Sequence, residues 1–415
     1  MYRVSHFVTR FALCLLAGVA LALVWANLGP RSYSDFVEWR LMDGLVGYPN
    51  PDALDGMGRT LTMQYLSGGV LMALFFLVLG KELWEALALR HGALHGRHAI
   101  APAIAALAGA ALPVALYRVL PGDLAAYGAA PGAGWPVPMA SDVVLTYVAG
   151  RWVFGSGHPA LRFLLIMTIL DDLLGLLTAG AAFPVEALHP AWLGLSFGAA
   201  LAAYLLFNLL PHRLAAANPA SPAAHFLHRR LGLWPFALAG IVSWFGFQQA
   251  GLMPALGLLP IVPALPHADR AFGIFAEAEE VLADPLNRLA HLLVLPVCAA
   301  LFLFGLTHGG VEFTAAGPVS WTVTAAMLIG KPLGVVAGGL VGARLVGGGL
   351  PEGMRAADLV RVGLLAAIGL TVPLFAVGAS LPGGALQAAA KLGLLAAGAL
   401  ALVLLAMIRR VGAQR

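Results

Sequence analysis

Long uninterrupted apolar segments restrict this chain more than any other feature of its sequence. They begin near residue 10 and recur to the C-terminus. A helix needs about 20 apolar residues to cross the hydrocarbon layer of a bilayer, and these segments lack the alternation of barrel strands. They predict about twelve spanning helices, at residues 10–28, 64–88, 98–119, 136–154, 160–182, 191–210, 232–248, 250–265, 286–307, 318–344, 357–379 and 384–408.

Composition supports one integral membrane unit over residues 1–415. The chain is 60% hydrophobic and 11% charged, which is too little charge to cover a soluble protein of this size. Its net charge of +4 does not indicate a nucleic-acid partner, because Lys and Arg are scattered. Cys14 and Cys298 lie in apolar segments, so neither a disulfide framework nor a zinc site is predicted. We interpret residues 10–28 as a retained helix, because they are long for a signal peptide and no clear small-residue cleavage site follows.

The distribution of Lys and Arg predicts the orientation. Cytoplasmic loops of membrane proteins carry an excess of these residues. With the N- and C-termini in the cytoplasm, only Arg31, Arg40, Arg59, Arg118 and Lys391 fall outside. The cytoplasmic side then holds Arg3, Arg10, Lys81, Arg90, Arg97, Arg151, Arg162, Arg213, Arg229, Arg230, Arg270, Arg288, Arg344, Arg355, Arg361, Arg409, Arg410 and Arg415. We therefore expect a multi-pass protein of a bacterial inner membrane.

Two connecting segments are distinctive. Residues 29–62 are expected outside, either as a solvated connector or as a small extramembrane element used in subunit contact. Residues 266–285 are expected in the cytoplasm, where several acidic residues cluster close to the membrane. That cluster fits an ordinary interfacial helix, and a role in sensing pH is the alternative.

Adjacent carboxylates lie in the middle of the fifth predicted span. About ten mostly apolar residues flank Asp171 and Asp172 on each side, and an ionisable group at this depth costs several kcal/mol. Neighbouring helix residues point about 100° apart, so both can line one cavity. Two such carboxylates cannot both stay ionised in a low dielectric without a cation. The pair is therefore expected to exchange protons for a hard cation such as Na⁺, for which carboxylate oxygens are natural ligands.

Lys331 is a second intramembrane charge, at the centre of the tenth predicted span. A midplane ammonium cannot easily extend to water. It needs a counter-charge, for which Asp171 or Asp172 is the obvious candidate. The pair is either structural or part of the transport site.

Asp142 follows a segment that cannot form a continuous helix. Pro136 and Pro138 predict a half-helix, an extended stretch and a second half-helix. Residues 369–373, which include Gly369, Thr371 and Pro373, predict a matching interruption. Broken spans in corresponding halves indicate a transport site, and non-helical backbone survives at this depth only where it lines a cavity. Asp142 is expected to compensate the positive helix ends, and Lys331 the negative ones.

Glu82 gives a weaker signal at the cytoplasmic end of the second predicted span. It is either an ordinary solvated helix end or a carboxylate at the mouth of the transport route. The histidines lie mostly in predicted loops, and we interpret them as surface groups.

Five segments resemble the NhaA-type sodium/proton antiporters, a family with inverted-topology repeats. The resemblance covers most of the chain, and the Asp-Asp and GKPLG segments are specific only together. The segments are MALFF with GKE at 72–76 and 80–82, PMASD at 138–142, LDDL at 170–173, IGKPLG at 329–334 and GLTVPLF at 369–375.

This resemblance implies a function and a set of roles. The fold would be all-α, with about twelve transmembrane helices, inverted repeats and two crossing discontinuous helices. Asp172 would be the principal cation ligand and proton carrier, and Asp171 the second carboxylate, alternately paired with Lys331. Ser141 stands where the family usually has Thr, and Glu82 matches a pH-responsive glutamate. A homodimer formed through a hairpin in 29–62, electrogenic exchange and no cofactor would follow.

Some segments depart from the family pattern. Its Asn-Asp-Gly appears here as Ser67-Gly68-Gly69, its His-Ala-Thr-Leu-Ala-Gly segment reads Met253-Pro254-Ala255-Leu256-Gly257, and its Asn-Ala-Gly has no clear counterpart around residues 301–305. A transporter of K⁺ or of an organic anion on the same scaffold therefore stays open. An intramembrane enzyme is disfavoured, because neither a His-Glu-x-x-His pattern nor a serine-protease arrangement is found. A channel is disfavoured too, because buried titratable pairs are more typical of coupled exchange.

Overall fold

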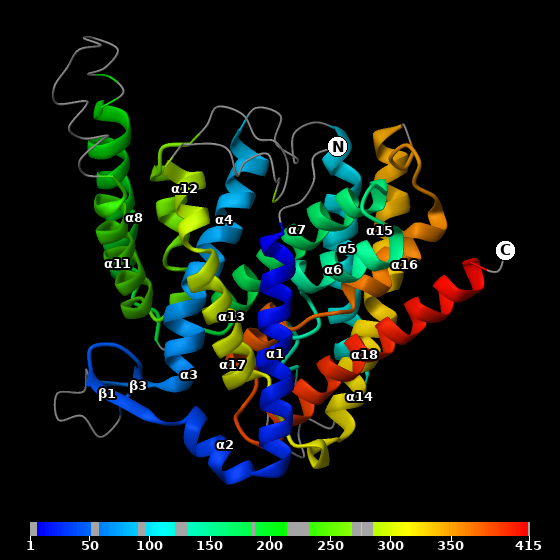
Figure 1. Cartoon of the computed structure of the whole chain (residues 1–415), viewed down its shortest axis with the longest axis horizontal. Helices are drawn as coiled ribbons and strands as arrows, with labels where there is room; N and C mark the ends of the chain where they lie inside the picture. Colours follow the sequence, from blue (N-terminus) through cyan, green and yellow to red (C-terminus); the bar gives the residue numbers. More distant parts are fainter. Residues whose placement is uncertain are drawn as a thin grey trace.

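The structure is a computed structural model that describes residues 6–50, 58–89, 97–120, 132–184, 187–211, 213, 232–267, 275, 285–347 and 349–413. Helices dominate it (Figure 1). Helix α1 (Phe7–Leu28) runs from the face that carries the N-terminus to the opposite face, where α2 (Pro30–Val37) begins. We call that opposite face the α2 face.

Six helical segments in the described part of the chain are long and apolar enough to cross a membrane, and two bent pairs raise the number to eight. The protein is therefore a multi-pass membrane protein. The six are α1, residues 63–88 (α3 Met63–Tyr65, η1 Leu66–Leu71 and α4 Met72–Ala88), α5 (Ile100–Val119), residues 191–209 (α8 Ala191–Ala203 and η4 Tyr204–Leu209), residues 318–346 (α14 Pro318–Ala325, η10 Ala326–Gly330 and α15 Lys331–Val346) and α18 (Ala385–Ala413).

The bent pairs match two other predicted spans. Helices α12 (Pro285–Leu292) and α13 (Val294–His308) meet at 48°, and α16 (Ala356–Ala366) and α17 (Thr371–Ser380) meet at 51°. Three further helices are α6 (Val143–Phe154), α7 (Pro159–Ala182) and α11 (Trp234–Gln249). Helix α7 occupies the predicted span 160–182 and carries both central aspartates.

Two predictions about helices are wrong. Residues 250–265 form no continuous α-helix but two short 3₁₀ segments, Pro254–Leu256 and Leu259–Ala264. Pro254, Pro260 and Pro263 account for this break, because proline lacks the N–H that a helix interior needs. In the predicted span 136–154, residues 132–139 form turns instead of a first half-helix, and the helix begins only at Val143.

The segment 29–62 is partly ordered as a small sheet on the α2 face. Strands β1 (Arg40–Gly44), β3 (Arg59–Thr62) and β2 (Tyr48–Pro49) are antiparallel in the order β1-β3-β2. Thr60 Oγ1 and Asp43 Oδ1 are 2.6 Å apart across β1 and β3. Gln248 of α11 ties the segment to the helices, because its side-chain nitrogen donates to Leu45 O at 2.7 Å. Most of the acidic segment 266–285 lies outside the described residues.

A stripe of glycines brings α15 against α5. A Cβ at Gly338 would approach Ile104 O to 2.6 Å, and one at Gly342 would approach Ala101 Cα to 2.7 Å. Only small residues allow two membrane helices to come this close. Lys331 is the first residue of α15, so the close packing of α15 on α5 also fixes the position of the Lys331 backbone.

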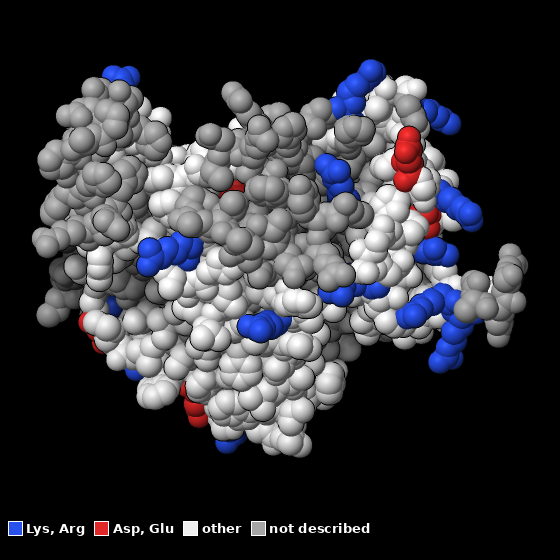
Figure 2. Space-filling view, turned by 45° about the horizontal axis from the view of Figure 1, so that its top comes forward, with Lys and Arg blue, Asp and Glu red and all other residues white. Residues whose placement is uncertain are grey.

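The outer surface of the helices is largely uncharged. Large apolar side chains are exposed there, including Leu295 (75%) and Trp321 (70%). Figure 2 shows broad areas without charge, with Lys and Arg gathered mainly toward the N-terminal face and the C-terminal helix. A soluble monomer rarely exposes continuous apolar area on this scale, so lipid covers these helices.

Candidate ion-exchange site

The two aspartates of α7 lie in the interior of the helix packing. Asp171 and Asp172 are each 1% exposed. Helix α7 packs on α5, α6 and α17, and Gly175 lets the interrupted segment approach: a Cβ there would lie 2.6 Å from the Cβ of Ala140. The apolar sequence of α7 therefore buries both carboxylates beside non-helical backbone, where polar partners are available.

The first interruption ends in a helix cap. Residues 132–139 make successive turns, with Val137 N donating to Gly134 O and Met139 N to Pro136 O. Pro136 and Pro138 suit such turns, because a proline cannot donate in a regular helix. Asp142 then caps α6, as its Oδ1 accepts from Leu145 N at 2.9 Å.

The second interruption meets the first at Asp142. Helix α16 ends at Ala366 and α17 starts at Thr371. The other carboxylate oxygen of Asp142, Oδ2, accepts from Thr371 N at 3.1 Å. One buried carboxylate thus faces the N-terminal ends of two helices, α6 and α17. Each helix N-terminus carries roughly half a positive charge, so together they roughly balance Asp142.

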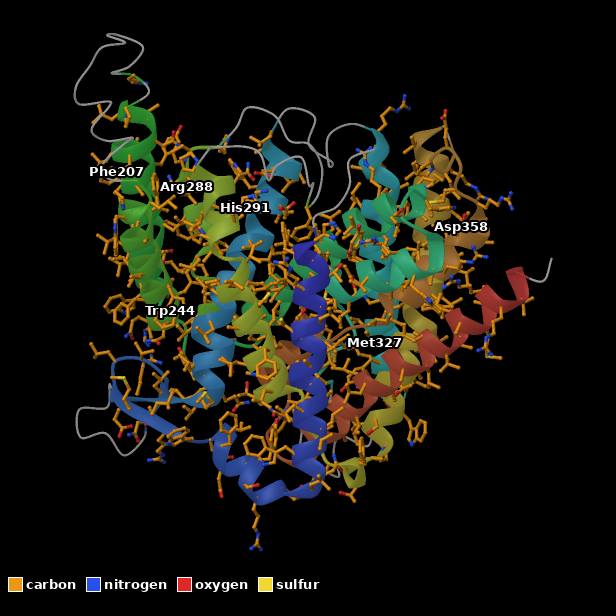
Figure 3. All side chains as sticks on the ribbon, in the orientation of Figure 1. Phe207, Trp244, Arg288, His291, Met327 and Asp358 are labelled. Atoms are coloured by element: carbon orange, nitrogen blue, oxygen red, sulfur yellow. The ribbon has the colours of Figure 1, made fainter. Side chains whose placement is uncertain are left out.

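The two breaks also touch through their backbones. A Cβ at Gly369 would lie 3.1 Å from Ala140 O and 2.9 Å from the end of the Met327 side chain. Met327 lies near the centre of the molecule (Figure 3). Glycine is needed at position 369 because no side chain fits between the two segments.

Lys331 is paired with Asp171. Its Nζ lies 2.5 Å from Asp171 Oδ2 and donates to Met139 O at 2.5 Å. Ser141 Oγ donates to the same oxygen of Asp171 at 2.8 Å. Lys331 is fully buried, so a counter-charge and full hydrogen bonding are required to keep it ionised. Asp171 Oδ2 provides the counter-charge, and Met139 O accepts a further hydrogen bond from Lys331 Nζ.

Within the described residues, Asp172 forms no ion pair with a Lys or Arg side chain. Its Oδ2 accepts from Val143 N at 3.2 Å. Its Oδ1, like Oδ1 of Asp171, is buried without a hydrogen-bond partner. Buried polar atoms are nearly always satisfied, so these two oxygens point to an occupant that the protein itself does not supply. A proton or a small hard cation satisfies a carboxylate oxygen.

The donor set suits a small monovalent cation better than a resident divalent metal. Within the described ranges, no three His, Cys, Asp or Glu side chains converge on one metal position. The orphaned oxygens of Asp171 and Asp172 would therefore be supplemented by hydroxyl, backbone or water oxygens. Ser141 is 0% exposed and already contacts Asp171, so its hydroxyl is the nearest such group.

Glu82 is buried rather than solvated. It is 2% exposed, its Oε1 lies 3.0 Å from Lys81 Nζ, and its Oε2 accepts from Phe275 N at 2.5 Å. Lys81 also pairs with Glu85 at 2.8 Å. This cluster excludes the solvated helix end and ties α4 to Phe275.

Sequence reasoning missed three groups of this interior. Two of them, Met139 O and Val143 N, are backbone atoms, and the identity of a residue does not show in which direction its backbone groups point. His308 was interpreted with the surface histidines, yet it is 8% exposed. The cap at Asp142 had a usable signal, because Ser-Asp before an apolar run is typical of a helix start.

Comparisons with known proteins agree with this architecture. The family model described as Na⁺/H⁺ antiporter 1 matches residues 4–408. A Na⁺/H⁺ antiporter NhaA of Jannaschia sp. is 47% identical over 399 residues, covering 95% of this chain and 94% of the relative. An NhaA of Geobacter sulfurreducens is 33% identical over 410 residues, covering 98% and 97%. These relatives are named as transporters and not as enzymes, and the chain belongs to the Na⁺/H⁺ antiporter 1 family.

Proposed function

We propose that the protein exchanges protons for Na⁺ or Li⁺ across a bacterial inner membrane, with Asp172 as the principal carrier of both. The observation that carries this proposal is the pair of buried, unsatisfied carboxylate oxygens on Asp171 and Asp172. The family resemblance supplies the substrate class, since the named relatives are Na⁺/H⁺ antiporters.

The charges around the site favour a single negative group that needs cargo. Lys331 balances Asp171, and the two helix N-termini roughly balance Asp142. Asp172 is left with one backbone N–H and two neighbouring carboxylates. An uncompensated charge at this depth is costly, so Asp172 is stable with a proton or with a cation and is unstable with neither. Competition between the two ligands for Asp172 couples their transport.

Lys331 and Asp171 give the exchange a second state. When a cation takes the Oδ1 oxygens of both aspartates, it competes with the Lys331 ammonium for the negative charge of Asp171. Release of Lys331 would then accompany cation binding, and its return would accompany cation release. Electrogenic exchange requires that Lys331 lose its proton when it is released, so that two protons move against one Na⁺. Ser141 follows Asp171 through its hydroxyl.

The proposal includes the membrane arrangement. Two interrupted segments, around Pro136–Pro138 and Gly369–Pro373, cross at Asp142 within a multi-helix fold of inverted repeats, and movement about this crossing gives alternating access. The Lys and Arg distribution favours both termini in the cytoplasm. The sheet of residues 40–62 is the proposed dimer contact. Glu82, tied to Phe275, is the proposed pH-responsive group on the cytoplasmic side.

The test measures collapse of an imposed pH gradient in everted membrane vesicles. Wild-type protein should collapse the gradient on addition of Na⁺ or Li⁺, and Asp172→Asn should not. Asp35→Asn is the matched control, because the same substitution there falls on an exposed aspartate of α2, outside the sheet. The proposal is wrong if neither Na⁺ nor Li⁺ collapses the pH gradient in vesicles with wild-type protein, or if Asp172→Asn retains full exchange. A response to K⁺ or to an organic anion alone would favour the alternative substrates.

A further inference from the structure

His308, at the end of α13, is a buried imidazole that the exchange site does not use. Its Nδ1 lies 2.9 Å from Thr307 Oγ1, and that hydroxyl lies 2.6 Å from Ser67 Oγ of η1. Gly68 makes room for the ring, because a Cβ there would come within 2.9 Å of two ring atoms. Specific packing and hydrogen bonds therefore fix the ring between α13 and η1.

A stack of aromatic rings continues from His308 toward the exchange site. The His308 ring lies 4.3 Å from that of Phe304 and nearly parallel to it, at 21°. Phe304 stacks on Phe375 at 4.8 Å, and Phe375 contacts Phe76 at 5.6 Å. Phe375 lies about one helical turn after Thr371, whose N–H binds Asp142. Phe375 thus links the ring stack to α17, the helix whose N-terminus meets Asp142.

The residue before His308 lines a cavity on the α2 face. The cavity has a volume of about 440 Å³, and Thr307 is part of its wall. Its charged and titratable lining consists of Lys391 from α18, Glu312 from the segment after α13, and Tyr33 from α2. Thr307 therefore connects the cavity wall to His308, because its Oγ1 hydrogen-bonds to the ring Nδ1.

A charged His308 is poorly accommodated in its present position. In the described part of the chain no carboxylate forms an ion pair with the ring, and Lys391 adds a like charge to the adjoining cavity. Burying an unpaired charge is costly, and the faces of the phenylalanine rings offset only part of that cost. A protonated ring therefore gains by turning from Phe304 toward the water of the cavity.

We propose that His308 is a positioning residue of the outer access route: it holds the ring stack closed while neutral and opens it when protonated from the cavity on the α2 face. This inference rests on the proposed exchange, for which the α2 face is the proton-supplying side. Outward opening then occurs when protons are available there. Access from this side is thereby linked to the ion that the protein would take up from it.

The experiment varies the pH on each side of right-side-out vesicles separately and measures ²²Na⁺ efflux. Wild-type efflux should rise as the outside pH falls, by up to about tenfold per pH unit for one titrating group. His308→Asn keeps a hydrogen-bonding atom near the Nδ1 position but cannot titrate, so its efflux should rise less steeply than that of wild type as the outside pH falls, with only protonation of Asp172 left to respond. Its dependence on inside pH should match wild type. His308→Gln, with its amide nearer the Nε2 position, should behave alike.

His291→Asn is the matched control, because His291 is exposed on α12, just before the bend that joins α12 to α13 (Figure 3). It should leave both pH profiles unchanged. Thr307→Val removes the hydroxyl that anchors the ring and should raise efflux at outside pH 8. The inference is overturned if folded His308→Asn and His308→Gln keep the wild-type dependence on outside pH. Absence of exchange by wild-type protein would instead refute the proposed function.

Discussion

Removal of the Lys331 side chain tests the central ion pair most directly. The ammonium is 1% exposed, the Asp171 carboxylate is 2% exposed, and they lie 2.5 Å apart. Lys331→Ala leaves that carboxylate buried without its counter-charge, a change that costs about 3–5 kcal/mol. Unfolding entropy near 2.1 cal/mol/K per residue gives roughly 0.9 kcal/mol/K for a chain of this length. The melting temperature should therefore fall by roughly 3–6 °C.

The assay follows intrinsic tryptophan fluorescence of the detergent-solubilised protein during heating. The loss should be smaller at pH 5 than at pH 8, because a proton can replace the missing ammonium on Asp171. Adding Asp171→Asn to Lys331→Ala removes both charges and should recover at least half of the lost stability, as expected for directly coupled residues. Arg361→Ala breaks an ion pair with Asp358 in which the arginine is 32% exposed. Such a pair contributes at most about 1 kcal/mol.

The ion-pair argument fails under either of two results. In the first, Lys331→Ala melts with the wild-type midpoint at pH 8, and the pair then contributes no stability. In the second, the double variant is no more stable than Lys331→Ala, and the cost then does not arise from an unpaired Asp171.

Two further substitutions test the packing and the α2 face. Gly338→Ala should destabilise the protein by about 1–3 kcal/mol, because the new Cβ would clash with Ile104 O. Gly378→Ala meets no atom within 4 Å and should stabilise α17 by up to about 1 kcal/mol. Equal shifts in the melting temperatures of the two variants would contradict the packing argument. Burial raises the pKa of Tyr33 to about 12 from 10.0, so its contribution to stability is complete below pH 10 and is lost as the pH rises toward 12. Tyr33→Phe should lower the melting temperature at pH 8, because Leu306 O and Gly310 N lose the hydroxyl that they bind. The variant should also lose less stability than wild type between pH 9 and 11. An unchanged decline in melting temperature over that range would exclude a stabilising role for the Tyr33 hydroxyl.

Several elements of the fold could be predicted because they depend on local sequence. Membrane helices α1, α5 and α18 follow from apolar length alone. The interruptions follow from Pro136, Pro138 and the segment 369–373, because proline and glycine restrict the backbone wherever they occur. The three prolines between residues 254 and 263 restrict the backbone in the same way, and they interrupt the predicted span 250–265.

The sequence by itself determined that charges would lie inside the membrane, because Asp171, Asp172 and Lys331 fall within apolar segments. Only the tertiary structure decided how these charges are divided. Lys331 lies 160 positions from Asp171, and the glycine contact between α15 and α5, with the rotation of α7, determines which aspartate it meets. Among the described residues, the same packing leaves Asp172 without a Lys or Arg partner. It also buries His308, although a position near the end of α13 suggests exposure. Side-chain pairing depends on how helices rotate and approach, and neither is encoded within a single segment.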